Sequence, residues 1–530
     1  MVNNWIYQCI SQHEHCSYNK DAELPTRVLD VSHDRSQDVR LFVPGQHDLR
    51  VGRYTALSYC WGMTPCVKTT SLNFSDHLKN ISFRSLPGTI QDAICITRAL
   101  NIRFLWVDAL CIIQGRDEVA RKDWETESSK MRTVYGNAFV TLSAAGAPNC
   151  QAGIFFPRSP RSPVSLRFLA FNNNDMVDGY VYVDIPFRRF SLSDDEPLDK
   201  RAWTLQERLL SPRLVKYGTY AISWECHSAS LAEFDAAVKT DSLKFYRLPR
   251  LLTTDHWMRV IEDYSSRNIT FIEDRIPAIS GIVQQFQKCL KMRYVAGLWD
   301  SKSDHTILLR LLIWHVVFDT EQQWNNMARL PGPTWSWLSV NTPVSWRYPP
   351  AGSGDGTSLG LDTRRDFVRW HAEIIDCQVR QDESSPLYPI KDGCITIRGI
   401  LKQIKALTVG ELRDQLYILD PPEDIGARRG VAKFDLVHDS PFQYIGGKTT
   451  PSRILHGENG IALPSCLYLA DVKVKDIYDT APCGILVAAD HGSPQQWRKV
   501  GVFSLLDYEI YSVVEAGWLG DGVSTEIELI

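Results

Sequence analysis

The sequence of 530 residues has little net charge, and it has no long uninterrupted apolar run. Its 58 basic and 62 acidic side chains nearly cancel, to a formal charge of −4. That balance creates no broad positive field for a polyanion, so binding to a nucleic-acid backbone is not expected. The most apolar stretch, residues 307–318, is interrupted by Arg310 and His315 and is too short to cross a bilayer. The sequence therefore predicts neither a nucleic-acid partner nor a membrane span.

The sequence also lacks an export signal and a dense cysteine framework. It begins Met1-Val2-Asn3-Asn4-Trp5, without a basic segment followed by an apolar one. The 13 cysteines are scattered along the chain, whereas disulfide-rich secreted proteins concentrate them in small domains. We therefore expect a cytoplasmic protein whose cysteines are reduced thiols.

Apolar residues make up 44% of the chain, enough for several buried cores at this length. Between residues 54 and 145 the apolar pattern alternates between strand and helix periods. Such alternation with short connections predicts a parallel α/β sheet, which binds ligands beyond the carboxyl ends of its strands. The expected strands are 54–59, 104–107 and 139–142, and the expected helices are 90–100 and 123–135, the second with Asp123 as its N-cap.

Further along, the pattern predicts a helix at 200–210, a hairpin at 214–224, helices between 257 and 315, and short strands from 368 onward. A Pro- and Gly-rich stretch around residues 349–356 is typical of a loop. We expect an N-terminal leader with a short helix and strand, an α/β domain, a helical region, a linker and a β-rich C-terminal domain. Their predicted bounds are 1–50, 51–228, 229–345, 346–366 and 367–530.

Several long segments, in the right order, resemble the heterokaryon-incompatibility (HET) domain family. The strongest is Leu105-Trp106-Val107-Asp108-Ala109-Leu110-Cys111, and a second is Arg201-Ala202-Trp203-Thr204-Leu205-Gln206-Glu207. The resemblance continues more weakly through segments on both sides of this block. The remaining segments that carry it are residues 54–62, 86–93 and 131–138.

The resemblance implies a fungal protein of non-self recognition, whose HET domain triggers programmed cell death. It implies a fold like that of the TIR domain, a flavodoxin-like α/β unit. Because some TIR domains cleave NAD through a glutamate, NAD is a candidate ligand and cleavage of NAD a candidate activity. The resemblance also implies a protein partner or self-association. An enzyme of fungal secondary metabolism, acting on a small molecule, is the alternative, and a non-catalytic interaction module is a third reading.

Two carboxylates are the leading candidates for chemistry. Asp108 directly follows a predicted buried strand, where it can hold a ligand or act as a general base; alternatively it caps the next loop. Glu207 lies four residues after Trp203 and shares a helix face with it, so its pKa can be raised as a general acid or base requires. The alternative for Glu207 is an ion pair with Arg201 or Arg208, or exposure to solvent.

Five further residues complete the predicted site. By analogy with the TIR arrangement, Glu127 is a third catalytic candidate, although acidic residues at the start of a helix also complement its dipole. Tyr59 and Trp61 follow the first strand and can line the same cleft as Asp108, or pack in the core. Arg201 and Trp203 are candidate ligand-binding residues, Arg201 through its planar guanidinium.

Cys9, His13 and Cys16 fall on one face of a predicted N-terminal helix. They can ligate zinc if a fourth residue joins them, but structural zinc sites usually supply two close pairs and the second pair is missing here. Packing of the helix is the simpler interpretation. From the sequence alone we predict no metal site.

Overall fold

The computed structural model describes residues 1–16, 21–31, 38–63, 65–156, 164–172, 175–183, 196–233, 252–317, 330–346 and 367–380, and further segments between 392 and 530. The predicted linker 346–366 lies outside these residues, except for residue 346. The chain divides into two compact units. Unit 1 comprises residues 1–250 and 268–282, and unit 2 comprises residues 251–267 and 283–530.

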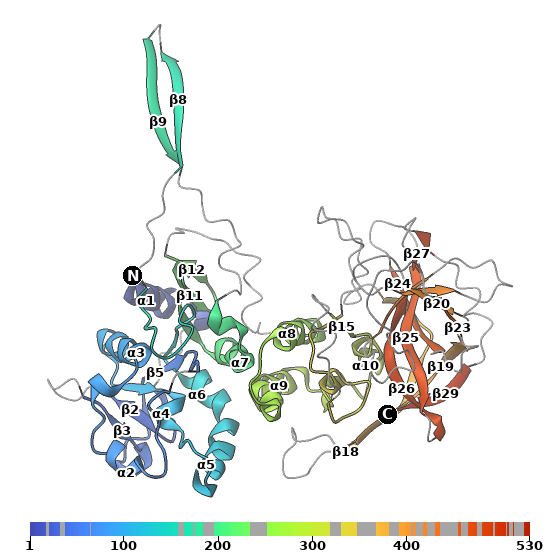
Figure 1. Cartoon of the computed structure of the whole chain (residues 1–530), viewed down its shortest axis with the longest axis horizontal. Helices are drawn as coiled ribbons and strands as arrows, with labels where there is room; N and C mark the ends of the chain where they lie inside the picture. Colours follow the sequence, from blue (N-terminus) through green and yellow to red (C-terminus); the bar gives the residue numbers. More distant parts are fainter. Residues whose placement is uncertain are drawn as a thin grey trace. The chain divides into compact units, whose positions relative to one another are not determined.

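Unit 1 is built on an eight-stranded sheet in the order β12-β11-β10-β7-β5-β6-β2-β3. Figure 1 labels β2, β3, β5, β11 and β12 of this sheet. The four central strands, β10, β7, β5 and β6, run parallel, and antiparallel strands flank them on both sides. The strands are β2 Val28–Asp30, β3 Arg40–Phe42, β5 Tyr54–Ser58, β6 Phe104–Trp106, β7 Val140–Ser143, β10 Arg213–Tyr217, β11 Ile222–Cys226 and β12 Ser230–Ala232.

Every residue of the four parallel strands is buried. Parallel strands covered on both faces consist of nearly continuous apolar runs, which is why the sequence locates three of them well. Two of the flanking strands, β2 and β3, come from the segment predicted as a leader, and they pair within the same sheet as β6. Strands β2 and β3 of the N-terminal segment are thus part of the α/β core.

Helices connect the parallel strands. The helices are α1 Val2–Gln12, α2 Phe74–His77, α3 Gly88–Ala99, α4 Asp108–Cys111, α5 Glu118–Ser129, α6 Met131–Asn137 and α7 Ala202–Leu210, with 3₁₀ turns η1 Glu14–Cys16, η2 Pro44–Gln46, η3 Phe83–Ser85, η4 Pro197–Lys200 and η6 Ile272–Arg275. Two small sheets, β1 Ala22–Glu23 with β4 Val51–Gly52 and β8 Val164–Asn172 with β9 Asp175–Val183, complete the described part of unit 1.

The prediction of one helix starting at Asp123 is wrong. The helix α5 begins at Glu118, and its N-cap is Asp117, whose side chain accepts a hydrogen bond from the backbone N–H of Ala120. Asp123 lies inside the helix and binds the guanidinium of Arg27 instead. The chain then starts a second helix, α6, so the predicted segment is two helices.

A glycine closes the turn after β5. Gly62 has φ +72°, a region that favours glycine, and a Cβ added there would lie 2.3 Å from the Cβ of Asn149. The backbone N–H of Cys150 donates to the carbonyl of Trp61 at 3.2 Å, which joins this turn to the loop after β7. The loop that carries Tyr59 and Trp61 is therefore held by backbone contacts.

Unit 2 starts with helices and continues as a β-rich region. Helices α8 Thr254–Ser266 and α10 Thr306–Leu311 lie in it, and α9 Pro277–Leu290 runs from unit 1 into unit 2. The helical prediction for 257–315 misses an antiparallel hairpin, β13 Arg293–Val295 with β14 Leu298–Asp300. Its turn residues, Ala296 and Gly297, both have positive φ, as a two-residue hairpin turn requires.

Tryptophans form much of the core of unit 2. Trp257 and Trp337 both donate their indole N–H to the carbonyl of Gly297, at 3.0 and 2.7 Å. Because an indole N–H needs an acceptor when it is buried, these bonds fix the hairpin turn against the core. The fully buried tryptophans of unit 2 are Trp257, Trp299, Trp314, Trp335, Trp337 and Trp346.

The β-rich C-terminal prediction is confirmed. An eleven-stranded sheet contains most of the described strands, with the path β17-β24-β19-β29-β26-β22-β21-β20-β23 and β18 and β25 paired to it (Figure 1). The strands of unit 2 beyond the hairpin are β15 His315–Val316, β16 Val344–Ser345, β17 Phe367–Trp370, β18 Glu373–Arg380, β19 Asp392–Gln403, β20 Ala406–Val409, β21 Tyr417–Asp420, β22 Gly430–Phe434, β23 Ile454–His456, β24 Ser465–Lys473, β25 Thr480–Asp490, β26 Ser493–Ser504, β27 Leu506–Asp507, β28 Ser512–Val513 and β29 Ser524–Leu529; η7 is Trp337–Ser339.

None of the helices in the described parts of the chain combines the length and the apolar character needed to cross a bilayer.

Candidate active site at the ends of the parallel strands

The carboxyl ends of β5 and β6 lie next to each other. In the parallel register Ala56 pairs with Trp106, so the residues that follow the two strands leave the sheet at the same edge. Tyr59 and Trp61 follow β5, and Asp108 follows β6 as the first residue of α4. The sequence predicted this arrangement from the position of Asp108 directly after an apolar run.

Asp108 is half-buried and accepts two hydrogen bonds. The indole N–H of Trp61 donates to Oδ2 at 2.9 Å, and the backbone N–H of Ala109 donates to Oδ1 at 2.6 Å. Burial raises the pKa of Asp108, and the positive charge of Arg201 together with these hydrogen bonds partly lowers it again. Asp108 therefore binds the backbone N–H of the next residue in α4 and also holds Trp61, a side chain of the predicted site.

Glu207 is buried on α7, with 7% of its surface exposed. Burial, helped by the negative charge of Asp108, raises the pKa of Glu207 to about 7, although the hydroxyl of Ser58 and the charge of Arg201 act to lower it. A carboxyl group with this pKa is present in both protonation states near neutral pH, so it can accept or donate a proton there. Asp108 and Glu207 are thus coupled electrostatically within one site.

Arg201 and Tyr59 complete the group around the two carboxylates. The Nη1 of Arg201 donates to the backbone carbonyl of Tyr59 at 2.6 Å, while its charge acts on both Asp108 and Glu207. Arg201 therefore links the loop after β5 to the start of α7.

The Tyr59 hydroxyl is buried without a hydrogen bond of normal geometry to any described residue, and only 3% of the residue is exposed. It lies close enough to Asp108 to favour the ionised carboxylate, and burial together with that charge holds the pKa of Tyr59 well above its usual value. An unsatisfied buried hydroxyl costs stability, so such groups in a native protein often have a functional role.

Ser58 and Tyr135 also belong to the site, and the sequence reasoning missed both. The Tyr135 hydroxyl donates to the carbonyl of Leu57 at 3.1 Å, and its proximity to Glu207 helps to lower the pKa of that carboxyl. Burial raises the pKa of Tyr135 itself, as does the charge of Glu207. Ser58 and Tyr135 lie within the segments 54–62 and 131–138, which carry part of the family resemblance, but only their position in space connects them with Glu207.

Two predicted site residues make their contacts elsewhere. Trp203 donates its indole N–H to Asp274 at 3.3 Å and packs edge-on against Trp124. Glu127 accepts hydrogen bonds from Thr26 and Lys130, both at 2.9 Å. Within the described residues, no hydrogen bond or ring contact joins either residue to Asp108 or Glu207. Their contacts favour a structural role, and their roles in catalysis or binding stay predictions.

Arg208, one of the two ion-pair partners expected for Glu207, binds other carboxylates instead. Arg208 binds Glu225 through Nε and Nη2, at 3.1 and 2.5 Å, and lies 3.7 Å from Asp199. Lys216 also binds Asp199, so these four buried side chains form a charge network of their own. Glu207 is thus left with Ser58, Tyr135, Arg201 and Asp108 as its polar neighbours.

Unit 1 is therefore an α/β domain with coupled carboxylates beyond the carboxyl ends of its parallel strands. Residues 54–207 match the family model described as heterokaryon incompatibility protein (HET). This stretch of unit 1 is therefore a HET domain. No curated protein and no solved structure matched the chain.

Proposed function

We propose that this HET-domain protein acts inside the cell in non-self recognition and triggers cell death through chemistry on a small molecule in its α/β domain. The observation that carries the proposal is the environment of Glu207, a buried carboxyl group with a pKa of about 7 beside Asp108 and Arg201. Perturbed carboxyl groups in a polar cluster are typical of active sites, where a proton must move near neutral pH.

The order of the parallel strands supports a TIR-like or flavodoxin-like arrangement. Numbered along the chain, β5, β6, β7 and β10 have the spatial order 2-1-3-4, with which the flavodoxin-like order begins. In that arrangement ligands bind beyond the carboxyl ends of the strands, where the order reverses between the first and third strands. In this chain that place is the junction of β5 and β7, next to Tyr59.

NAD is the first substrate to test. In its hydrolysis the bond from ribose C1′ to the nicotinamide nitrogen breaks, and the electron pair of that bond neutralises the pyridinium ring. Water adds to C1′, giving ADP-ribose, and one proton is released. Ionised Glu207 would stabilise the positive charge that develops on the ribose, as carboxylates do in glycoside hydrolysis, or accept the proton of the water. Arg201 would hold a phosphate and the Tyr59 hydroxyl a ribose oxygen.

The test is nicotinamide release from NAD by the purified full-length chain, beside Glu207→Gln and Glu125→Gln. Glu125 is an exposed carboxylate on α5, so its substitution leaves the buried cluster unchanged and serves as the matched control. We expect release by the wild type and the control, and a loss of at least about a hundredfold in Glu207→Gln. Equal release by all three proteins would remove Glu207 from the mechanism, and no release by the wild type would exclude NAD as substrate.

The cellular role is tested with the same variants. Overproduction in a fungal host should arrest growth with the wild type and with Glu125→Gln, but not with Glu207→Gln at equal protein level. The trigger would be a protein partner or self-association of the chain. Normal growth with abundant, folded wild-type protein would contradict the proposed role in cell death.

A further inference from the structure

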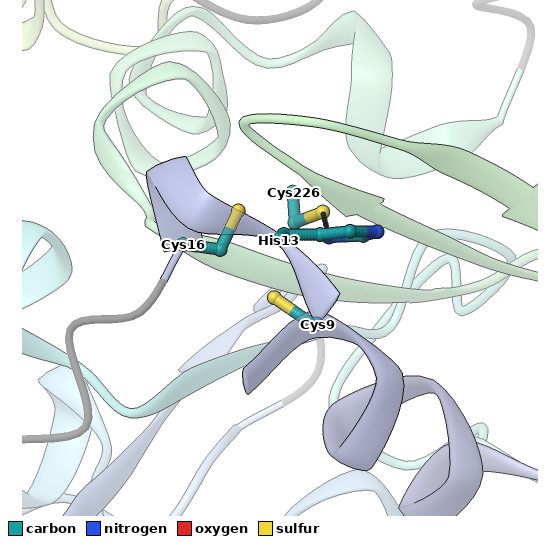
Figure 2. A group of neighbouring side chains, drawn as sticks. All are labelled: Cys9, His13, Cys16 and Cys226. Carbon is teal, nitrogen blue, oxygen red and sulfur yellow. Dashed lines mark hydrogen bonds between the residues drawn. The ribbon is translucent and has the colours of Figure 1, made fainter. Parts of the chain in front are cut away.

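A second polar cluster lies at the N-terminal end of unit 1 and is independent of the proposed function. Cys9, His13, Cys16 and Cys226 each offer one ligand atom, and these atoms all lie within 4.8 Å of one another. Figure 2 shows the four side chains pointing toward a common centre. The Sγ of Cys226 lies 3.3 Å from the Nδ1 of His13.

These separations fit a metal site. With Zn–S of about 2.3 Å and Zn–N of about 2.0–2.1 Å, tetrahedral geometry places ligand atoms about 3.5–3.8 Å apart. The side chains need only small rotations to reach those distances. Three thiolates and one imidazole are a ligand set that favours zinc over magnesium or calcium, which bind oxygen. We infer that Cys9, His13, Cys16 and Cys226 bind one structural zinc ion.

The fold assembles the site from two distant parts of the chain. Cys9 lies on the buried side of α1, His13 ends that helix, and Cys16 ends the 3₁₀ turn η1, where its N–H donates to the carbonyl of His13 at 2.9 Å. Cys226 is the last residue of β11, and its N–H donates to the carbonyl of Ala229 at 2.9 Å. The three N-terminal ligands thus meet the fourth, which follows about 210 residues later.

The surroundings fit the charge of the proposed centre. Three thiolates, a neutral imidazole and Zn²⁺ carry a net charge of −1. The guanidinium of Arg213 is 3% exposed; its Nε lies 3.4 Å from the Sγ of Cys9, and its Nη2 donates to the carbonyl of Cys16 at 2.6 Å. The hydroxyl of Ser228 lies 3.5 Å from the Sγ of Cys16. A buried cation that contacts a ligand sulfur and orients a ligand backbone is typical of the outer shell of a metal site.

Packing alone explains the cluster less well. The three cysteines are buried, and buried thiols are common in apolar cores. Apolar packing gives no reason for an imidazole nitrogen to contact the Sγ of Cys226 and a buried guanidinium to contact the Sγ of Cys9 within the same cluster. All four positions around the ion would be filled by protein, so the site would be structural and closed to substrate.

The ion would connect the N-terminal helix with the helix that carries Glu207. Cys226 follows Glu225, whose carboxylate binds Arg208, the neighbour of Glu207 on α7. Zinc at Cys226 would therefore stabilise the end of β11 and, through it, the position of α7. Loss of the ion would destabilise unit 1 before it affected unit 2.

The first test is the metal content of the full-length chain, produced with zinc in the medium and purified without chelators. We expect one zinc per chain in the wild type and in Cys95→Ser, an exposed cysteine that serves as the matched control. Cys226→Ser and His13→Gln should each lower zinc occupancy by about tenfold or more. A wild-type protein without zinc, or full occupancy in both site variants, would overturn the assignment.

Two further measurements keep the test decisive if Cys226→Ser fails to fold. Wild-type protein reconstituted with Co²⁺ should show thiolate-to-cobalt charge transfer and the intense visible bands of tetrahedral coordination. Arg213→Met should weaken zinc binding by about 10–100-fold while leaving the four ligands in place. Cobalt spectra of an octahedral ion, or a disulfide between two of the three cysteines in place of metal, would contradict the proposal.

Discussion

The substitution Glu207→Gln should stabilise unit 1 relative to the wild type, and this stabilisation should be larger at pH 8 than at pH 5. Burial holds the pKa of Glu207 at about 7 in the folded chain, against 4.5 for an ordinary glutamate. Well below pH 4.5 the Glu207 carboxyl is protonated in both the folded and the unfolded chain, so it does not change the free energy of unfolding. As the pH rises to 7, only the unfolded chain loses its proton, so the folded state of the wild type loses stability.

The size of the effect follows from the two pKa values. Each unit of difference corresponds to about 1.4 kcal/mol, so the whole window contributes about 3 kcal/mol, of which about 2.5 kcal/mol falls between pH 5 and pH 8. Glutamine has nearly the same shape and does not titrate, so it removes this pH-dependent term. Because the charge of Asp108 raises the pKa of Glu207, the substitution also lowers the pKa of Asp108, and the measured difference includes both groups.

The assay is unfolding in urea, monitored by tryptophan fluorescence. A fluorescent label attached within unit 1 reports the unfolding of that unit separately. The quantity of interest is the difference in free energy of unfolding between Glu207→Gln and wild type, measured at pH 8 and at pH 5. Subtracting the two values cancels the titration of the groups whose pKa the substitution leaves unchanged, so that Glu207 and Asp108 remain, and the exposed Glu125→Gln should give a change near zero. If Glu207→Gln also gives no change, its carboxyl titrates normally and the reasoning about the site is refuted.

Three other outcomes follow from the same geometry. In the NAD assay, kcat/KM should rise about tenfold per pH unit up to pH 7 and then level off, because Glu207 acts as the ionised carboxylate; a flat profile would exclude that role. Gly62→Ala should lower the free energy of unfolding by about 2–4 kcal/mol, from its φ of +72° and the 2.3 Å contact, whereas Gly45→Ala, with open space around it, should change it little in the same thermal melts. Arg208→Met should cost about 3–5 kcal/mol because it leaves Glu225 charged and buried, and a loss below about 1 kcal/mol would mean that the pair is well solvated.

The sequence alone determined the centre of the α/β domain. Strands β5, β6 and β7 are buried throughout and consist of apolar residues with a few small hydroxyl residues, so these segments were recognisable in the sequence. The helix α3 was equally clear, because one apolar face repeats at the helical period. The place of Asp108 followed directly, since a residue after a parallel strand must lie at the carboxyl edge of the sheet.

Helix ends and local breaks were harder to predict. Asp123 has the character of an N-cap, but Asp117 lies earlier and binds a free backbone N–H of the first turn, so the helix starts there. Asp123 instead forms an ion pair with Arg27, which is 96 residues away in the chain. Helix propensity depends only on neighbouring residues, so it cannot predict an ion pair with a residue so far away in the sequence.

Only the tertiary structure decided which side chains surround the reactive groups. Glu207 has a raised pKa because α7 buries it near Asp108, while Ser58 and Tyr135 lower the pKa only in part, and no spacing in the sequence contains that fact. Cys226 joins Cys9, His13 and Cys16 because β11 ends beside α1. Periodicity reports which face of an element is buried, whereas a site depends on which buried faces meet, and that is fixed by the packing of the whole domain.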